Sequence, residues 1–160
     1  MNKPYDIPPA FNLYKFQLKA LPVLSAWGLA SFIAGLVWLP NREAWRAGFG
    51  TQFAAWGLID AFIALLGQRA AARNHLRWQR GEIDKQEQQR QAAQFERLLW
   101  LNAGLDICYV LGGKWLVSRQ PQDARRQGMG WGIIVQGGVL FIWDVILGIL
   151  VHNRGRGNKP

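Results

Sequence analysis

Four long apolar stretches constrain the fold of this chain more than any other feature. They run from Leu21 to Leu39, from Phe49 to Gly67, from Leu98 to Val117 and from Met129 to Val151. Each holds about 18 residues or more, enough at ~1.5 Å per residue to cross a hydrocarbon core of roughly 30 Å. The mean hydropathy of the whole chain is −0.04, a value typical of soluble proteins, because long polar segments lower the average over the apolar stretches. We therefore expect an all-α membrane protein with four transmembrane helices.

The positive charges flank the apolar stretches, and they predict the orientation of the chain. The net charge is +9, but the basic residues do not form a face with interleaved aromatic residues, so we expect no nucleic-acid partner. One side holds Lys3, Lys15, Lys19, Arg69, Arg73, Arg77, Arg80, Lys85, Arg90, Arg97, Arg154, Arg156 and Lys159, and the other holds Arg42, Arg46, Lys114, Arg119, Arg125 and Arg126. The positive-inside rule then predicts cytoplasmic N and C termini. Abundant Trp and Arg favour a bacterial cytoplasmic (inner) membrane.

The same pattern divides the chain into five parts. These are an N-terminal cytoplasmic or interfacial segment (1–20), a first transmembrane hairpin (21–67), a linker (68–97), a second transmembrane hairpin (98–151) and a basic tail (152–160). Alternating apolar and polar residues from Pro9 to Lys19 predict a short interfacial helix. The linker is rich in helix formers and is interrupted by Gly81, which predicts two helical extensions that turn back there.

The linker is also the segment that we expect to bind a partner. A polar helical hairpin at 68–97 is a candidate docking site, through which the protein would join a homo-oligomer or a larger membrane complex. The alternative is a solvated stalk without a partner. In either case the lipid bilayer surrounds the four apolar stretches.

Matching residues in the two hairpins favour an internal repeat. The triplet Gly48-Phe49-Gly50 matches Gly128-Met129-Gly130, and Gln52 precedes Asp60 by the same eight positions that separate Gln136 from Asp144. A duplicated two-helix hairpin explains both matches. Two tandem hairpins would be related by a pseudo-twofold axis along the membrane normal.

Glycine pairs seven residues apart recur in three of the apolar stretches. The pairs are Gly28 and Gly35, Gly50 and Gly57, and Gly130 and Gly137. Two helical turns place both members of a pair on one face, where the missing side chains let neighbouring helices approach closely. The glycines therefore predict helix packing in a tight four-helix bundle.

Three aspartates lie inside three different apolar stretches. Asp60, Asp106 and Asp144 are seven or eight residues from the predicted cytoplasmic boundary, which places them at one common depth of roughly 10 to 12 Å. An unpaired carboxylate there costs about 2.5 kcal/mol or more. Hydrogen bonding of protonated carboxyls, a shared cation or exchange of protons with water would each offset this cost.

Further polar residues follow the aspartates at helical spacing. Gln52 and Asp60 lie eight residues apart with Trp56 between them, while Asn102 and Tyr109 flank Asp106 on one helical face. Gln136 lies along a related face of the last apolar stretch. Together with Ser25, these side chains predict a polar track through the bundle, unless each amide only satisfies a neighbouring backbone carbonyl.

No enzymatic or cofactor motif is present in the sequence. His75 and His152 lie beyond the apolar boundaries without ligand spacing, so we expect solvated histidines, no metal and no cofactor. Cys108 is the only cysteine, which rules out an intrachain disulfide. An enzyme that acts on lipid or quinone is a third class without a residue set to support it.

Two segments resemble a known type of protein. Leu98-Leu99-Trp100-Leu101-Asn102-Ala103-Gly104-Leu105-Asp106-Ile107-Cys108-Tyr109 and Gly130-Trp131-Gly132-Ile133-Ile134-Val135-Gln136-Gly137-Gly138, followed by Asp144, resemble an uncharacterised family of small bacterial four-span membrane proteins. The resemblance covers Leu21 to Val151. It implies the topology but no activity.

The sequence favours two functions. The first is an integral membrane scaffold or accessory subunit whose buried Asp, Asn and Gln side chains fix its packing. The alternative is a small transporter or a proton or cation conduit that uses Asp60, Asp106 and Asp144. The two functions require different properties of the carboxyl groups. In a scaffold these groups must be hydrogen-bonded to their neighbours, whereas in a conduit they must exchange protons or ions.

Overall fold

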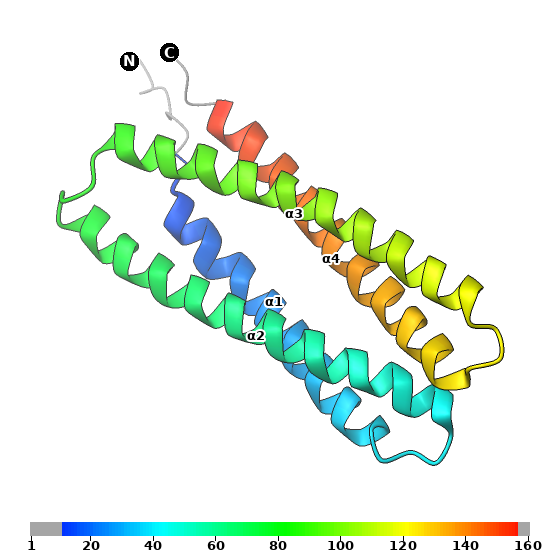
Figure 1. The fold of residues 1–160 in the computed structure, drawn as a ribbon. Coiled ribbons are helices and arrows are strands. Elements are labelled where there is room, and N and C mark those ends of the chain that lie inside the picture. The colour runs from blue at the N-terminus through cyan, green and yellow to red at the C-terminus, as the bar shows by residue number, and fades with distance from the viewer. Residues whose placement is uncertain (1–10, 157–160) are drawn as a thin grey trace, which may run out of the picture.

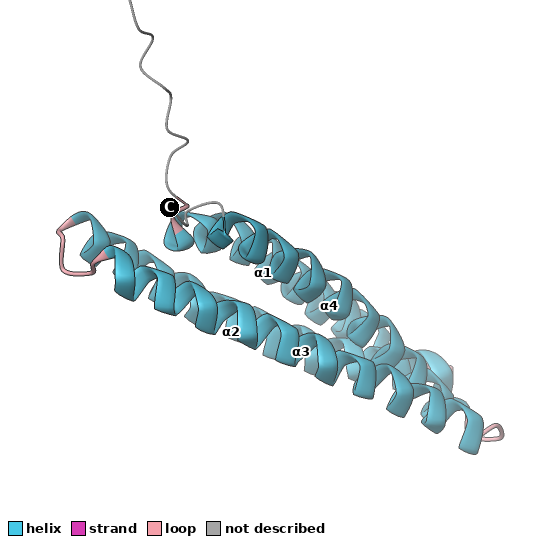
Figure 2. Ribbon diagram, turned by 90° about the horizontal axis from the view of Figure 1, so that it is seen from above, coloured by secondary structure: helices cyan, strands magenta, loops and turns pink. Residues whose placement is uncertain are grey.

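The described chain is a bundle of four long helices. In this computed structural model residues 11–156 are described. They form α1 (Leu13–Trp38), α2 (Ala44–Gln79), α3 (Lys85–Arg119) and α4 (Ala124–Arg156), and no strand occurs among them (Figure 2). The predicted all-α fold with four helices is confirmed.

The helices pack as two antiparallel pairs. α1 packs along α2 and α3 packs along α4, while α2 and α4 make the main contacts between the pairs. The α2–α3 turn, the start of α1 and the end of α4 lie together at what we call the Gly81 end (Figure 1). The connections α1–α2 and α3–α4 lie at the opposite end, here called the Asn41 end. The origin of these pairs in a tandem duplication stays a prediction.

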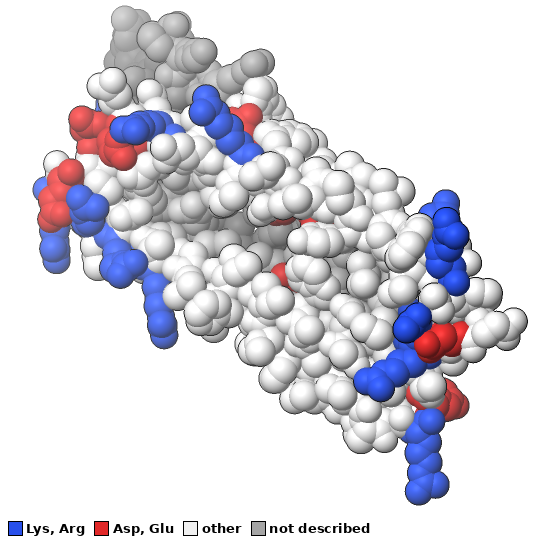
Figure 3. Space-filling model, in the orientation of Figure 1, with Lys and Arg blue, Asp and Glu red and all other residues white. Residues whose placement is uncertain are grey.

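Three of the four described helices are long and apolar enough to cross a membrane. These are α1, α2 and the Ala124–Arg154 part of α4. α3 is long enough but does not meet the same hydropathy criterion, because Asn102, Asp106 and Lys114 interrupt its apolar residues. The predicted fourth span at Leu98 to Val117 is therefore not established by composition. On the face shown in Figure 3, basic residues gather towards the two ends and a body without them lies between.

Glycines lie at all the main helix contacts. A Cβ atom on Gly28 would lie 2.5 Å from the backbone nitrogen of Ala61, and one on Gly113 would lie 2.7 Å from the carbonyl oxygen of Gly130. The predicted packing glycines Gly35, Gly50, Gly57 and Gly130 lie similarly close to neighbouring helices, whereas a Cβ on Gly137 would lie 3.2 Å from its nearest neighbour and is less tightly packed. Helix backbones thus approach to a distance that any side chain would prevent.

The start of α1 is anchored in the α2–α3 turn. Asn12 caps α1, and Leu13 and Tyr14 are almost completely buried in a cluster with Ile83. Residues from Leu13 to Lys19 therefore form the first turns of a continuous α1, and not the separate interfacial helix predicted from the sequence. The predicted reversal near Gly81 is present, where a φ of 75° suits glycine.

Candidate functional site

Three acidic side chains are buried between the helices. Asp60 of α2, Asp106 of α3 and Asp144 of α4 are 5, 4 and 8% exposed, and we call them the aspartate cluster. In Figure 3, acidic atoms are visible in a hollow midway along the body, far from the charged ends. The three acids that the sequence selected are therefore each buried within the bundle, on helices that pack against one another.

Two of these carboxyl groups each have one buried oxygen without a hydrogen-bond partner. Asp60 Oδ2 and Asp106 Oδ2 are both buried and unpartnered. None of the ion pairs among residues 11–156 includes a member of the aspartate cluster. Along the chain, no Lys or Arg lies within seven residues of any of the three. The hydrogen bonds that would make Asp60 and Asp106 structural glue are therefore incomplete.

The aspartates are staggered along the bundle. Gly132 of α4 lies against Gln52 of α2, and Asp60 is eight residues past Gln52 whereas Asp144 is twelve past Gly132. Asp144 therefore lies about one helical turn, or roughly 6 Å, closer to the Gly81 end. The backbone of Asp106 lies level with Gly137, seven residues before Asp144. Counting residues along the chain predicts one common depth, whereas the register of the α2–α4 contact offsets Asp144 from Asp60 along the bundle.

Gln136 lies on the Asn41 side of the cluster and is 1% exposed. Its Oε1 accepts a hydrogen bond of 2.9 Å from Trp27 Nε1 of α1, while its Nε2 is buried without a partner. Gln52 is half-buried, with its Cβ against Gly132. The two glutamines therefore have different surroundings, although they occupy matching positions in the predicted repeat.

An aromatic pair adjoins the carboxyl groups. The rings of Trp56 and Tyr109 meet edge to face with their centroids 4.9 Å apart, which joins α2 to α3. Trp56 lies one turn before Asp60, and Tyr109 lies one turn after Asp106. Because α2 and α3 run in opposite directions, both rings lie on the Asn41 side of their aspartates. The predicted residue Asn102, one turn before Asp106, is half-buried.

The acids do not form a recognisable metal site. Among residues 11–156, no three His, Cys, Asp or Glu side chains come together in an arrangement that could hold a metal ion. The stagger of the aspartates explains this, since a shared ion would need carboxylate oxygens at about 2.0 to 2.6 Å from one point.

Polar contacts continue from the cluster towards the Gly81 end. Gln68 Nε2 donates a 2.6 Å hydrogen bond to the buried Ser25 Oγ, which links α2 to α1. Further along, His152 Nδ1 lies 2.7 Å from Glu96 Oε1 and links α4 to α3. His152 is thus paired and half-buried, and not the solvated histidine expected from the sequence.

Sequence reasoning missed two members of this site. Trp27 is the partner of Gln136, and Ser31 is 2% exposed with a buried, unpartnered hydroxyl group. Both lie four residues apart in α1, a spacing that places them on one side of the helix. That spacing was available in the sequence, but only the packing of α1 shows which side faces the bundle.

One family comparison matches most of the chain. The sequence model of a family of unknown function, DUF6992, matches residues 23–145. These residues include the aspartate cluster, Gln136, Trp27 and the Trp56–Tyr109 pair. Neither the curated proteins nor the solved structures contain a significant match to the chain.

Proposed function

The chain belongs to the family of unknown function DUF6992, and from the geometry of the aspartate cluster we propose that it is a small membrane conduit for protons. Asp60, Asp106 and Asp144 would bind and release protons in turn. The family assigns no activity, so the proposal depends on the chemistry of these side chains alone.

The single observation that carries the proposal is the pair of unpartnered oxygens. Asp60 Oδ2 and Asp106 Oδ2 are buried without a donor, a state that costs free energy in an apolar bundle. A carboxyl group held this way must take up a proton or contact water to remain in place. Acids inside membrane bundles with these properties typically belong to proton or ion pathways.

The stagger favours protons over a bound metal ion. A metal ion needs several ligand atoms around one point, whereas a proton moves between groups that follow one another along a path. Asp106, Asp60 and Asp144 follow one another towards the Gly81 end, where the Ser25–Gln68 bond and then the Glu96–His152 pair continue the polar contacts. This order describes a path, with water needed between its members.

The membrane placement is part of the proposal. We place all four helices across the bilayer, including α3, because Leu101, Leu111 and Trp115 are about 60% exposed (62, 59 and 60%) on a helix that packs along α4. We also propose that the Gly81 end faces the cytoplasm of a bacterium, and the basic residues near that end support this orientation by the positive-inside rule. Linker 68–97 then projects into the cytoplasm.

The scaffold function predicted first from the sequence has weaker support from the geometry. It requires the buried polar groups to be satisfied by neighbours, and Asp60, Asp106 and Gln136 each keep an unpartnered atom. A scaffold or accessory subunit would also need a partner at linker 68–97 or a second copy of the chain. The scaffold is therefore an outcome of the experiment below.

Proton flux into liposomes tests the proposal. The purified protein is reconstituted with an enclosed pH-sensitive dye, and an outward potassium gradient with valinomycin supplies the driving force. We expect faster acidification than in empty liposomes, and a loss of most of this flux in the double variant Asp60→Asn, Asp106→Asn. The matched control is Asp123→Asn, which makes the same chemical change at an exposed cap of α4 and should leave the flux unchanged.

Two results would overturn the proposal. Wild-type flux equal to that of empty liposomes would show that no conduit exists. A double variant that conducts normally would show that protons bypass Asp60 and Asp106. If the double variant instead fails to fold, as judged by size exclusion and circular dichroism, the single variant Asp144→Asn and the wild-type flux still decide the question.

A further inference from the structure

We propose that Asp60 and Asp106, together with the aromatic pair next to them, also bind an organic cation, a lipophilic molecule with one delocalised or quaternary positive charge. This inference extends the proposed function, because such a cation would compete with the protons that the same carboxyl groups bind. It names a ligand class that the family match does not supply.

The first requirement of such a site is unneutralised negative charge. Asp60 and Asp106 come from different helices, are buried and have no ion-pair partner among residues 11–156. Each also keeps one buried oxygen without a donor. A cation placed between them would offset the cost of two ionised carboxylates in an apolar bundle.

The second requirement is a lining that suits an apolar cation. Trp56 and Tyr109 form their edge-to-face pair one turn to the Asn41 side of the two carboxyl groups. On the same Asn41 side of the cluster, Trp27 of α1 donates a hydrogen bond to Gln136 Oε1. Aromatic faces attract quaternary and delocalised cations, and the attraction strengthens where water is excluded.

The third requirement is access from outside the bundle. Acidic atoms are visible in a hollow midway along the face drawn in Figure 3, although the two unpartnered oxygens themselves are buried. Tyr109 is 40% exposed and Trp56 is half-buried, which leaves the aromatic pair at the edge of the site and not in its interior. A lipophilic cation could therefore enter from the apolar surroundings of the protein.

The same features disfavour a metal ion. No three ligating side chains in the described part of the chain converge on one point. A small hard cation also gains little from indole and phenol rings compared with its lost water shell. A large cation needs no coordination sphere, and it can contact one carboxylate and two rings at once.

Equilibrium binding of tetraphenylphosphonium tests this inference. Isothermal titration calorimetry of the full-length protein in detergent should show saturable binding that weakens as the pH falls, since protonated carboxyls lose their attraction for a cation. We expect the variant Asp60→Asn or Asp106→Asn to weaken binding by about tenfold or more, and Trp56→Leu by roughly threefold to tenfold. Trp56→Phe should restore most of the affinity because it keeps an aromatic ring, and Asp123→Asn should bind like the wild type.

Each outcome decides the matter. Non-saturable uptake, or binding that Asp60→Asn and Asp106→Asn both leave unchanged, would overturn the inference and indicate simple partitioning into detergent. If the protein conducts protons but does not bind tetraphenylphosphonium, the proposed function stands without the cation site. If it binds the cation with the expected variant effects but conducts no protons, the cation site stands and the conduit is wrong.

Discussion

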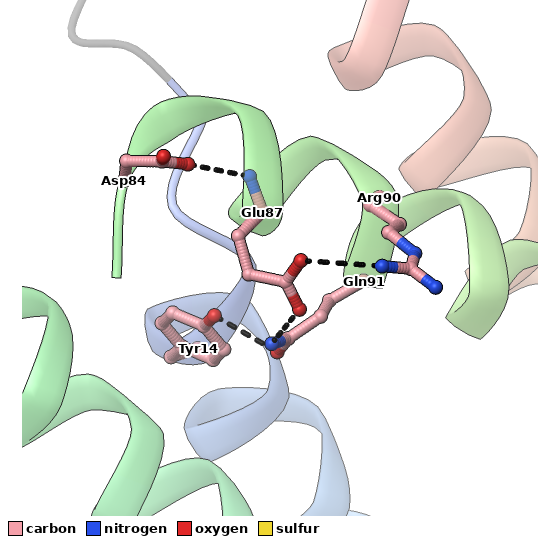
Figure 4. A network of polar contacts seen from close by, with 5 residues as sticks. All are labelled: Tyr14, Asp84, Glu87, Arg90 and Gln91. Carbon is pink, nitrogen blue, oxygen red and sulfur yellow. Dashed lines mark hydrogen bonds and ion pairs between the residues drawn. The ribbon is translucent and has the colours of Figure 1, made fainter. Parts of the chain in front are cut away.

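Two polar clusters in this molecule differ in how well their hydrogen-bonding groups are satisfied. At the Gly81 end, the Tyr14 network consists of Tyr14, Asp84, Glu87, Arg90 and Gln91 (Figure 4). Tyr14 OH donates to Gln91 Oε1, and Gln91 Nε2 donates to Glu87 Oε1, each at 2.9 Å. Asp84 Oδ1 accepts from the backbone nitrogen of Glu87 at 2.7 Å, and Arg90 lies 3.8 Å from the Glu87 carboxylate.

The aspartate cluster shows the opposite arrangement. Its carboxyl groups are more deeply buried than those of the Tyr14 network, yet Asp60 and Asp106 keep oxygens without donors and no basic residue lies nearby along their helices. Satisfied networks stabilise a unique packing, whereas buried unsatisfied groups persist where function needs them. We therefore expect the Tyr14 network to stabilise the fold at the Gly81 end, and the aspartate cluster to serve the function in the middle of the bundle.

The largest expected effect is on proton flux in the double variant Asp60→Asn, Asp106→Asn. Loss of both proton carriers should lower the flux by about a hundredfold or more, the scale of positioned acid–base groups. The thermal unfolding temperature should hold or rise, because the change removes two buried charges and keeps the shape of the side chains. A large fall in unfolding temperature would mean that the aspartate cluster is structural. The two clusters would then have the same role.

The next effect concerns the packing that holds both clusters in place. Gly28→Leu should lower the free energy of unfolding by about 2 to 3 kcal/mol, because its Cβ would meet the α2 backbone at Ala61 and Gly57. Unfolding in mixed detergent measures the change. Gly104→Leu is the matched control, since a Cβ there meets nothing within 4 Å, and equal losses in both variants would contradict the close approach of α1 and α2.

A smaller effect is expected from Tyr14→Phe. This change removes the hydroxyl donor to Gln91 and should cost about 1 to 1.5 kcal/mol of unfolding free energy. The proton flux per folded molecule should stay at the wild-type value, because Tyr14 is remote from the aspartate cluster. Reduced flux at unchanged stability would show that the Tyr14 network also takes part in conduction.

The smallest effect is expected at the start of α3. Asp84→Ala removes the side chain that caps this helix and should cost about 0.5 to 1 kcal/mol, whereas Asp84→Asn keeps a capping acceptor and should be close to neutral. Thermal melts of the two variants measure the difference. Because both variants lose the charge and only Asn keeps an acceptor, equal losses for Asn and Ala would indicate that the charge, and not the cap, stabilises the turn.

Much of the fold could be predicted because it depends on local patterns. Apolar length predicted the helices, Gly81 predicted the reversal between α2 and α3, and the spacing of Asp60, Asp106 and Asp144 selected residues that the structure buries within the bundle. The span in α3 was less secure, since its polar residues lower the mean hydropathy of an otherwise apolar helix.

The rest depends on contacts between distant segments, which periodicity does not encode. The start of α1 packs into the α2–α3 turn through Tyr14 and Leu13, so its first turns are not a separate surface helix. Likewise, Gln136 finds its partner in Trp27, which lies 109 residues away in the chain. No local pattern predicts this pairing, because many other polar side chains at helical spacing could also have been the hydrogen-bond partner of Gln136.

By itself, the sequence determined that the chain forms long helices, most of them apolar enough to cross a bilayer, and that three of them carry one acid each within an apolar stretch. Hydrophobic length and helical rise suffice for this conclusion, since both are properties of a single segment. Only the tertiary structure decided the stagger of the aspartates, which oxygens lack a donor and which rings line the site. These features depend on the relative register of the helices, which is set where glycines let their backbones touch.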